Sequence, residues 1–269
     1  MMQTHFYGNN LEGPLVGMNV KNYKSNEFFQ DIGLDAAVTY SNMRRLNKDM
    51  LENCCITFPS NRILLLPGTG AKNRETFERD IGKAVCRVMN DANECVDVVL
   101  IDSNSGEDKL SLALMEEADL IVVNLTQHRY LLDKFFTNQE ILKYHRKIYY
   151  LFGDYDENSS YNINNCRRKY SKHMNYNNSG VIPYCTRYLD AQNNSEIAEF
   201  MQRGLQVDKD EALDKMFQII PRAFPWGRYI REETQGFFYN SQRAIEKMMD
   251  MLQISHRNRR KEECMHESK

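Results

Sequence analysis

The chain has 269 residues, of which 42% are hydrophobic and 27% are charged, an ordinary composition for a globular protein that is soluble in water. Thirty-five Lys and Arg residues against 37 Asp and Glu residues give a formal net charge of −2, which argues against a protein dominated by nucleic-acid binding. No apolar run approaches the roughly 20 residues that a membrane span needs, and the scattered cysteines are typical of reduced thiols in a cytoplasmic protein.

Short apolar runs alternate with helical patterns along most of the chain. After a Gly- and Asn-rich loop and weak helical segments in residues 1–62, the apolar runs lie at 63–66, 96–101, 120–123 and 148–151, with a weaker one at 180–182. Helical spacing of apolar residues occupies 74–90, 109–118, 131–144 and 163–172. Brief, nearly uninterrupted apolar runs are typical of parallel strands buried on both faces. The alternation predicts a three-layer α/β domain with a mostly parallel sheet and right-handed crossovers.

The C-terminal part is helical by pattern, with breaks at Pro221 and Pro225. Its last amphipathic piece covers 243–254, and the polar residues 255–269 are expected to be frayed. We therefore predict an α/β domain over 1–204 and a helical extension over 205–269. The extension is rich in methionine, which is more typical of a packing face than of a membrane anchor, so association with a membrane surface is only weakly indicated.

The most informative segment runs from Asp97 to Gly106, where an apolar strand ends in Asp102 and small polar residues follow. In a nucleotide-binding sheet, an acid at the carboxyl end of a strand lies beside the phosphates and orients Mg²⁺ directly or through water. In many other α/β proteins such an aspartate only caps the next helix. Taken alone, the segment leaves both interpretations open.

The order of further motifs favours one of the two interpretations of Asp102. Leu64-Leu65-Leu66-Pro67-Gly68 precedes the acidic strand, and Ala118-Asp119 with its apolar run, Phe152-Gly153-Asp154 and Val181-Ile182-Pro183 follow it. This succession resembles the ParA/MinD family of deviant P-loop ATPases, over about residues 3–203. The family positions chromosomes, plasmids, division machinery or pili in bacterial cells. The resemblance implies a P-loop NTPase fold of the SIMIBI type.

The resemblance also assigns roles to residues. Asn10, Leu11 and Gly17 fall in the family's switch region. Asp102 and Gly106 match the acidic strand and the turn after it, with Asp102 on the side of Mg²⁺. Asp154 falls where the family often has an asparagine that reads adenine, and Pro183 lies at the turn near the base. Asp154 could accept a hydrogen bond from the adenine amino group but could not also donate to the ring nitrogen, and a plain polar strand end is the alternative.

The chain departs from the family at its start. The phosphate-binding motif GxxxxGK[ST] does not occur in the 269 residues. Aligned back from Asn10-Leu11, Gln3 and His5 fall where the family has paired acids. We therefore expect a P-loop NTPase fold that lacks its first strand and phosphate loop, and ATP with Mg²⁺ is only a weakly supported cofactor.

Two functional hypotheses remain. In the first, the protein is a ParA/MinD-like bacterial positioning protein, related to pili, secretion systems or partition, in which nucleotide hydrolysis is lost or absent from this chain. An origin in the TadZ-like branch, which has atypical P-loops, suits this hypothesis. In the second, the chain is a fragment of an active ATPase whose P-loop lies upstream of Met1. Both predict a protein partner or a homodimer, and neither predicts a nucleic acid clearly.

Overall fold

The computed structural model describes residues 2–5, 15, 32–43, 46–58, 63–69, 82–103, 109–206 and 225–266. They fall into two compact units, one made of residues 1–117 with 192–197 and the other of residues 118–191 with 198–269. Each unit has its own sheet. The predicted division at residue 204 is a different one and stays a prediction.

The first unit contains a four-stranded sheet. Its strands are β1 (Met2–His5), β2 (Ile56–Thr57), β3 (Leu64–Leu66) and β4 (Val99–Asp102), in the order β2-β3-β1-β4. β1 pairs in parallel with both β3 and β4, whereas β2 is an antiparallel edge strand. The predicted strands β3 and β4 are confirmed. β1 was not predicted because its polar residues interrupt an apolar run, and β2 was not predicted because it has only two residues.

Within the described residues, four helices accompany this sheet: α3 (Leu34–Met43), α4 (Lys48–Cys54), α6 (Gly82–Cys95) and α7 (Lys109–Glu117). Their apolar faces share one core with Met2 and Leu66 of the sheet. Asp91 of α6 is a buried acid in this core. Its carboxylate accepts hydrogen bonds from the Ser41 hydroxyl at 3.3 Å and the Leu46 backbone N–H at 3.1 Å, which satisfies an otherwise costly buried charge.

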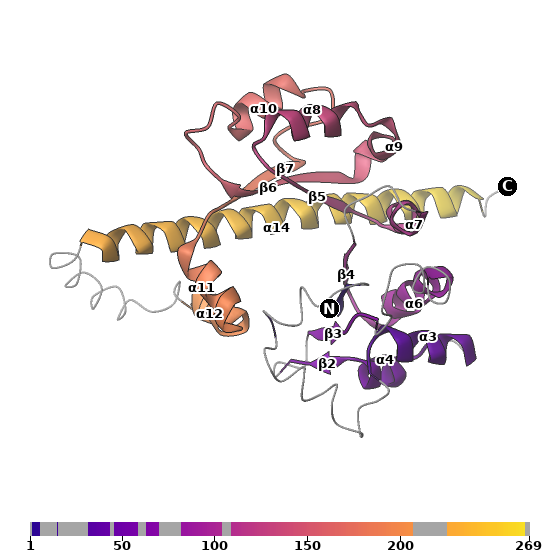
Figure 1. Cartoon of the computed structure of the whole chain (residues 1–269). Helices are drawn as coiled ribbons and strands as arrows, with labels where there is room; N and C mark the ends of the chain where they lie inside the picture. The colour runs from indigo at the N-terminus through magenta and orange to yellow at the C-terminus, as the bar shows by residue number, and fades with distance from the viewer. Residues whose placement is uncertain are drawn as a thin grey trace. The chain divides into compact units, whose positions relative to one another are not determined.

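The second unit is built on a three-stranded parallel sheet. β5 (Ile121–Leu125), β6 (Ile148–Tyr155) and β7 (Ser179–Pro183) lie in that order, as the apolar runs predicted. The residues from Ile148 to Tyr150 are fully buried in the central strand β6. Helices cover both faces of the sheet, with α8 and α10 on one face and α14 on the other (Figure 1). This unit is therefore a three-layer α/β arrangement of the predicted class.

Its helices are α8 (Arg129–Thr137), α9 (Gln139–Leu142), α10 (Ile163–Lys169), α11 (Thr186–Asn194), α12 (Ile197–Gln206) and α14 (Pro225–His266), with a 3₁₀ turn η2 (His145–Lys147) before β6. The single helix predicted over 131–144 is two helices. Asn138 ends α8, and its side chain accepts the Glu140 N–H at 3.1 Å and thereby caps α9.

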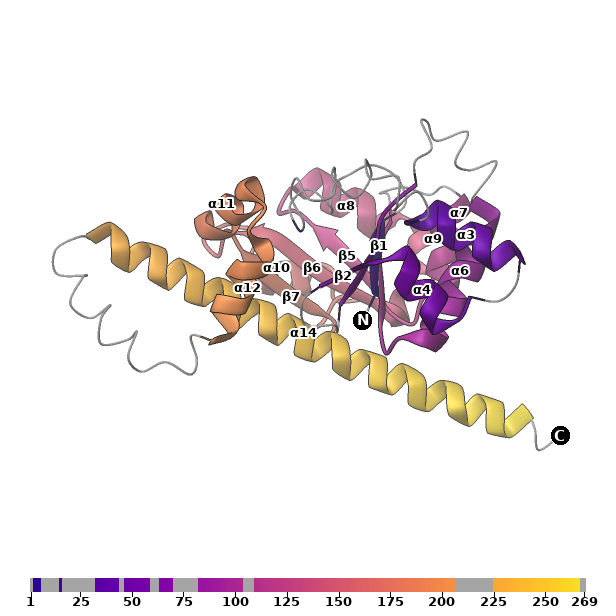
Figure 2. The same cartoon turned by 90° about the horizontal axis from the view of Figure 1, so that it is seen from below.

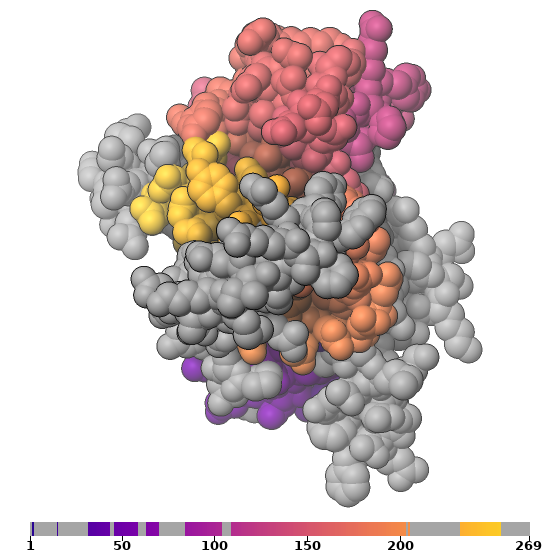
Figure 3. Space-filling view, turned by 90° about the vertical axis from the view of Figure 1, so that its left-hand side faces the viewer, coloured from indigo at the N-terminus to yellow at the C-terminus, as the bar shows by residue number. Residues whose placement is uncertain are grey.

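The long helix α14 begins at Pro225, a residue favoured at the first helical position. Its 42 residues continue to His266, and the expected fraying of residues 255–269 stays a prediction. The helix runs along β7 (Figures 1 and 2). In Figure 3, its described side chains (yellow) lie directly against the salmon-coloured surface of the β6-to-β7 segment. By the criteria of length and hydropathy, no helix in the described ranges could span a membrane.

Two kinds of contact hold α14 in place. At Gly180 of β7, an added Cβ atom would overlap the hydroxyl of the buried Tyr149 and lie 3.3 Å from the Ala244 Cβ of α14. Further along, the Phe237 ring stacks on Tyr188 of α11, with centroids 4.9 Å apart. The close approach at Gly180 therefore depends on two small residues, and the aromatic contact adds apolar area.

The end of β6 is irregular. Its pairing with β7 shifts register between Phe152 and Tyr155, and Asp154 between them has a φ of 46°. The left-handed region is unfavourable for most residues with a Cβ atom, and Asp and Asn tolerate it better than others. The backbone at Asp154 is therefore held in place by the strand end around it.

We predict opposite effects for two glycine substitutions in this unit. Gly180→Ala should lower the free energy of unfolding by about 1–3 kcal/mol, because the methyl group overpacks against Tyr149 and Ala244. Gly236→Ala should raise it by about 0.5–1 kcal/mol, because nothing lies within 4 Å of its added Cβ atom and alanine favours the helix. Denaturant unfolding of both variants measures the difference, and equal effects would contradict the close seat of α14 on β7.

We predict a ranking of stabilities at position 154. Asp154→Gly and Asp154→Asn should match or exceed the parent protein, and Asp154→Val should lose about 1–2 kcal/mol, because only valine is strongly disfavoured at positive φ. Equilibrium unfolding in urea tests this order. A valine variant as stable as the parent protein would show that the left-handed conformation is not required.

Candidate functional site

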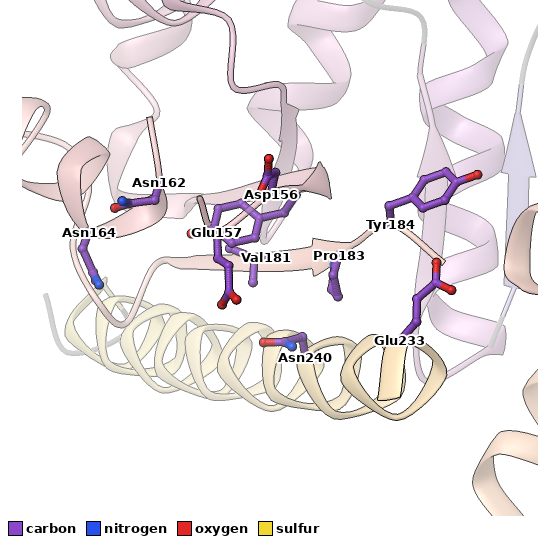
Figure 4. A pocket seen from close by; sticks show the side chains of 10 residues that line it. Asp156, Glu157, Asn162, Asn164, Val181, Pro183, Tyr184, Glu233 and Asn240 are labelled. Atoms are coloured by element: carbon purple, nitrogen blue, oxygen red, sulfur yellow. The ribbon is translucent and has the colours of Figure 1, made fainter. Parts of the chain in front are cut away.

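A pocket of about 710 Å³ opens in the second unit where β6 and β7 end. Its lining residues are Tyr155, Asp156, Glu157, Asn162, Asn164, Val181, Pro183, Tyr184, Glu233 and Asn240. Figure 4 shows that Val181 and Pro183 come from β7, while Glu233 and Asn240 rise from α14. The carboxyl end of a parallel sheet is where α/β proteins place ligands, and the pocket has the volume of a small-molecule site.

One wall of the pocket is the loop after β6, which Gln127 holds from the end of β5. The Gln127 side chain accepts the Asp156 N–H at 2.8 Å and donates to the carbonyl oxygens of Asp156 and Tyr161 at 2.9 and 3.1 Å. The Asp156 carboxylate accepts the Asn158 N–H at 2.9 Å in a local turn. Asp156 therefore reaches the pocket from a fixed backbone.

The start of α10 forms a second wall. The Asn162 side chain caps α10 by accepting the Asn165 N–H at 3.1 Å, and the Tyr155 hydroxyl accepts the Ile163 N–H at 3.1 Å. Burial is the main reason that the pKa of Tyr155 is raised, so this phenol stays neutral at physiological pH. Both residues are therefore engaged in structure as well as lining the pocket.

The third wall comes from α14. The Glu233 Oε1 atom accepts the Thr186 N–H at 2.7 Å and the Thr186 hydroxyl at 3.1 Å, which ties α14 to the start of α11. The Glu233 Oε2 atom is buried and has no hydrogen-bond partner among the residues that the structure describes. Asn240, about two turns further along α14, donates to the Gly236 carbonyl at 2.8 Å. Glu233 thus brings a carboxylate oxygen with unused acceptor capacity.

The pocket has a negative character. Three of its ten lining residues are carboxylates (Asp156, Glu157 and Glu233), three are asparagines, and none is a lysine or arginine. Such a lining accepts hydrogen bonds from an amine or from the donor edge of a base, and it repels phosphate. The pocket therefore does not fit the triphosphate of ATP, although a base alone would meet suitable acceptors.

The residues predicted for the site are not all brought together. Pro183 lines the pocket. Asp154 lies at the end of β6, two residues before Asp156, but does not line the pocket. Asp102 ends β4 in the other unit, where it is exposed and in register with His5. Gly106, Asn10, Leu11 and Gly17 lie outside the described residues, so their roles stay predictions.

No group of three or more His, Cys, Asp or Glu residues that could hold a metal occurs within the described ranges. The assignment of Mg²⁺ to Asp102 rests on that single residue and stays a prediction. Sequence reasoning missed Glu233, Asn240 and Gln127. The first two come from a helix about 50 residues beyond β7, and no motif in the sequence links that helix to the strand.

Comparisons with known proteins agree with this arrangement. No family model matches the chain, and no curated protein matches it in sequence. In structure, it is similar to a ParA family ATPase from Chlorobium tepidum TLS, with a TM-score of 0.56 and 15% identity, over 73% of this chain and 77% of that one. It is also similar to a chain of the MinC:MinD cell division protein complex of Aquifex aeolicus, with a TM-score of 0.50 and 14% identity, over 75% and 76%. The chain has a ParA/MinD-like fold of the P-loop NTPase type.

Proposed function

We propose that the protein is a ParA/MinD-like bacterial positioning protein, acting for a pilus or secretion system or in partition, in which nucleotide hydrolysis is lost or absent from this chain. The observation that carries the proposal is a ParA/MinD-like fold whose pocket at the ends of β6 and β7 is lined by acids and amides without a cation. A pocket of this charge suits a donor group better than a phosphate. The missing GxxxxGK[ST] motif supports the same conclusion.

Positioning implies partners. One of the similar structures is a complex of two cell division proteins, which supports a protein partner or a homodimer for this chain. We place the protein in the cytoplasm. Contact with a membrane surface is a weaker part of the proposal.

The alternative is that the chain is a fragment of an active ATPase whose P-loop lies upstream of Met1. One observation favours it. β4 ends in Asp102, and among the described strands it pairs only with β1, so its other edge has no partner strand there. A strand of a parallel sheet is ordinarily covered on both sides, so a further strand would suit this edge. An in-frame strand and phosphate loop in the DNA upstream of Met1 would establish this alternative, and a stop codon there would oppose it.

The proposal predicts that the 269-residue protein releases no phosphate from ATP in the presence of Mg²⁺ above the rate in buffer. Asp102→Ala should leave this result unchanged, because the chain has no phosphate loop to hold the nucleotide against that carboxylate. A phosphate-release assay measures both proteins. Asp97→Ala, which removes an exposed acid from the start of the same segment, is the matched control. Phosphate release that requires Mg²⁺, falls in Asp102→Ala and survives in Asp97→Ala would overturn the loss of hydrolysis.

A further inference from the structure

Three cations surround one tyrosine just before the amino end of β7, and one of them, Arg167, also donates to the pocket-lining Asn164 at 3.4 Å. The Arg167 guanidinium of α10 lies 5.1 Å from the centre of the Tyr176 ring, and the Lys247 ammonium of α14 lies 3.8 Å from it. Arg243, one turn before Lys247, donates to the Tyr176 hydroxyl. We call Arg167, Arg243 and Lys247 the cationic cluster.

Neutral groups hold the cluster in place. Lys247 donates to the carbonyl oxygens of Tyr176 and Ser179 at 2.8 and 3.0 Å. Arg167 donates to the Ser179 hydroxyl at 2.9 Å and to the Ser179 carbonyl at 3.2 Å. These bonds orient the cations, but neutral acceptors do not cancel their charge.

No carboxylate forms a salt bridge with any member of the cluster in the part of the chain that the structure describes. The pKa of Arg243 is raised, chiefly by Tyr176 and least by Glu246, which forms no salt bridge with it among the described residues. The same unit does pair a cation elsewhere, since Lys169 of α10 lies 2.6 Å from the Asp133 carboxylate. The cationic cluster therefore combines three positive charges with no negative one in contact.

The surroundings are unfavourable for the charged forms of Lys247 and Arg167, whereas the pKa of Arg243 is raised, chiefly by its interaction with Tyr176. Burial, followed by repulsion from Arg167 and Arg243, lowers the pKa of Lys247 to about 8. Burial is also the main cause that lowers the pKa of Arg167. An anion bound between the three side chains would remove the repulsion and favour the charged form of Lys247.

We infer that the cationic cluster of Arg167, Arg243 and Lys247 binds a phosphate-type oxyanion. Two guanidinium groups and an ammonium group around one tyrosine side chain supply charged donors of the kind that bind oxyanions, and three positive charges suit a dianion. Arg243 and Tyr176 are exposed, so an anion can reach the cluster from solvent. The inference goes beyond the proposed function, because it concerns neither Asp102 nor the carboxylates of the pocket.

The alternative is that the cluster only fixes α14 against β7. The two cases differ in their response to anions. A docking contact needs no ligand, whereas a binding site stabilises the folded protein by an amount that grows with the logarithm of the ligand concentration above its Kd.

The test is thermal unfolding of the full chain in increasing inorganic phosphate, with ionic strength held constant by chloride. Phosphate should raise the Tm of the parent protein. Lys247→Gln and Arg243→Gln should each weaken the apparent affinity for phosphate about tenfold, the effect of losing one charge-assisted contact. Arg168→Gln removes an exposed cation from the same helix as Arg167 and should keep the parent response. If Lys247→Gln does not fold, Arg243→Gln provides the test. The Arg243 side chain is exposed, so its replacement should leave folding intact.

The inference would be overturned by a phosphate response that both cluster variants retain, or by a response that Arg168→Gln loses equally. Vesicles distinguish the sources of phosphate. Binding to phosphatidylglycerol vesicles but not to phosphatidylcholine vesicles, with loss of binding in Arg243→Gln, would identify a lipid headgroup. A response to inorganic phosphate without vesicle binding would identify a soluble phosphate compound. No response in either arm would leave the cluster as a docking contact and refute the site.

Discussion

The close packing of α14 on β7 is the contact on which the second unit depends. It needs a strand residue without a side chain, Gly180, opposite a helix residue with the smallest one, Ala244, beside the buried Tyr149. Because the helix lies this close, side chains one turn or more to either side of Ala244 reach groups at both ends of β7. Glu233 and Asn240 form a wall of the pocket at the carboxyl end, and Lys247 meets backbone carbonyls at the amino end. Both charged features of the unit are thus products of one packing contact.

The sequence predicts those parts of the fold that rest on local pattern. Apolar runs predict β3 to β7 correctly, although β4 and β5 alternate between buried or half-buried and exposed positions rather than being buried on both faces. The central strand β6 is the clearest case. β1 is not predicted in this way because Gln3 and Thr4 interrupt its apolar pattern. Its place between β3 and β4 depends on pairing with strands that lie about 60 residues or more along the chain. The break at Asn138 depends on a cap that an apolar pattern does not show.

The site is less predictable than the fold, and the reason is physical. Pro183 could be expected at the pocket because it ends a predicted strand. Glu233 and Asn240 arrive through the packing of a helix whose position no local signal specifies. The ParA/MinD-like fold is shared with proteins of 14–15% identity, so the fold alone does not determine the chemistry of its pockets. What distinguishes this chain is the choice of side chains at the strand ends, which in the second unit are acids and amides.

The helix dipole does not explain why α14 carries Glu233 at the pocket and Lys247 at the cationic cluster. A helix dipole favours acids at the amino end and cations at the carboxyl end, but the effect fades within the first and last turns. Lys247 lies near the middle of α14, well away from its carboxyl end. Glu233 and Lys247 are 14 residues apart, about 21 Å along the axis, which is more than twice the distance over which salt screens charges at physiological ionic strength. Glu233 therefore does not neutralise Lys247. Each end needs a counter-charge of its own, and a donor group at the pocket and an oxyanion at the cationic cluster would meet the two needs independently.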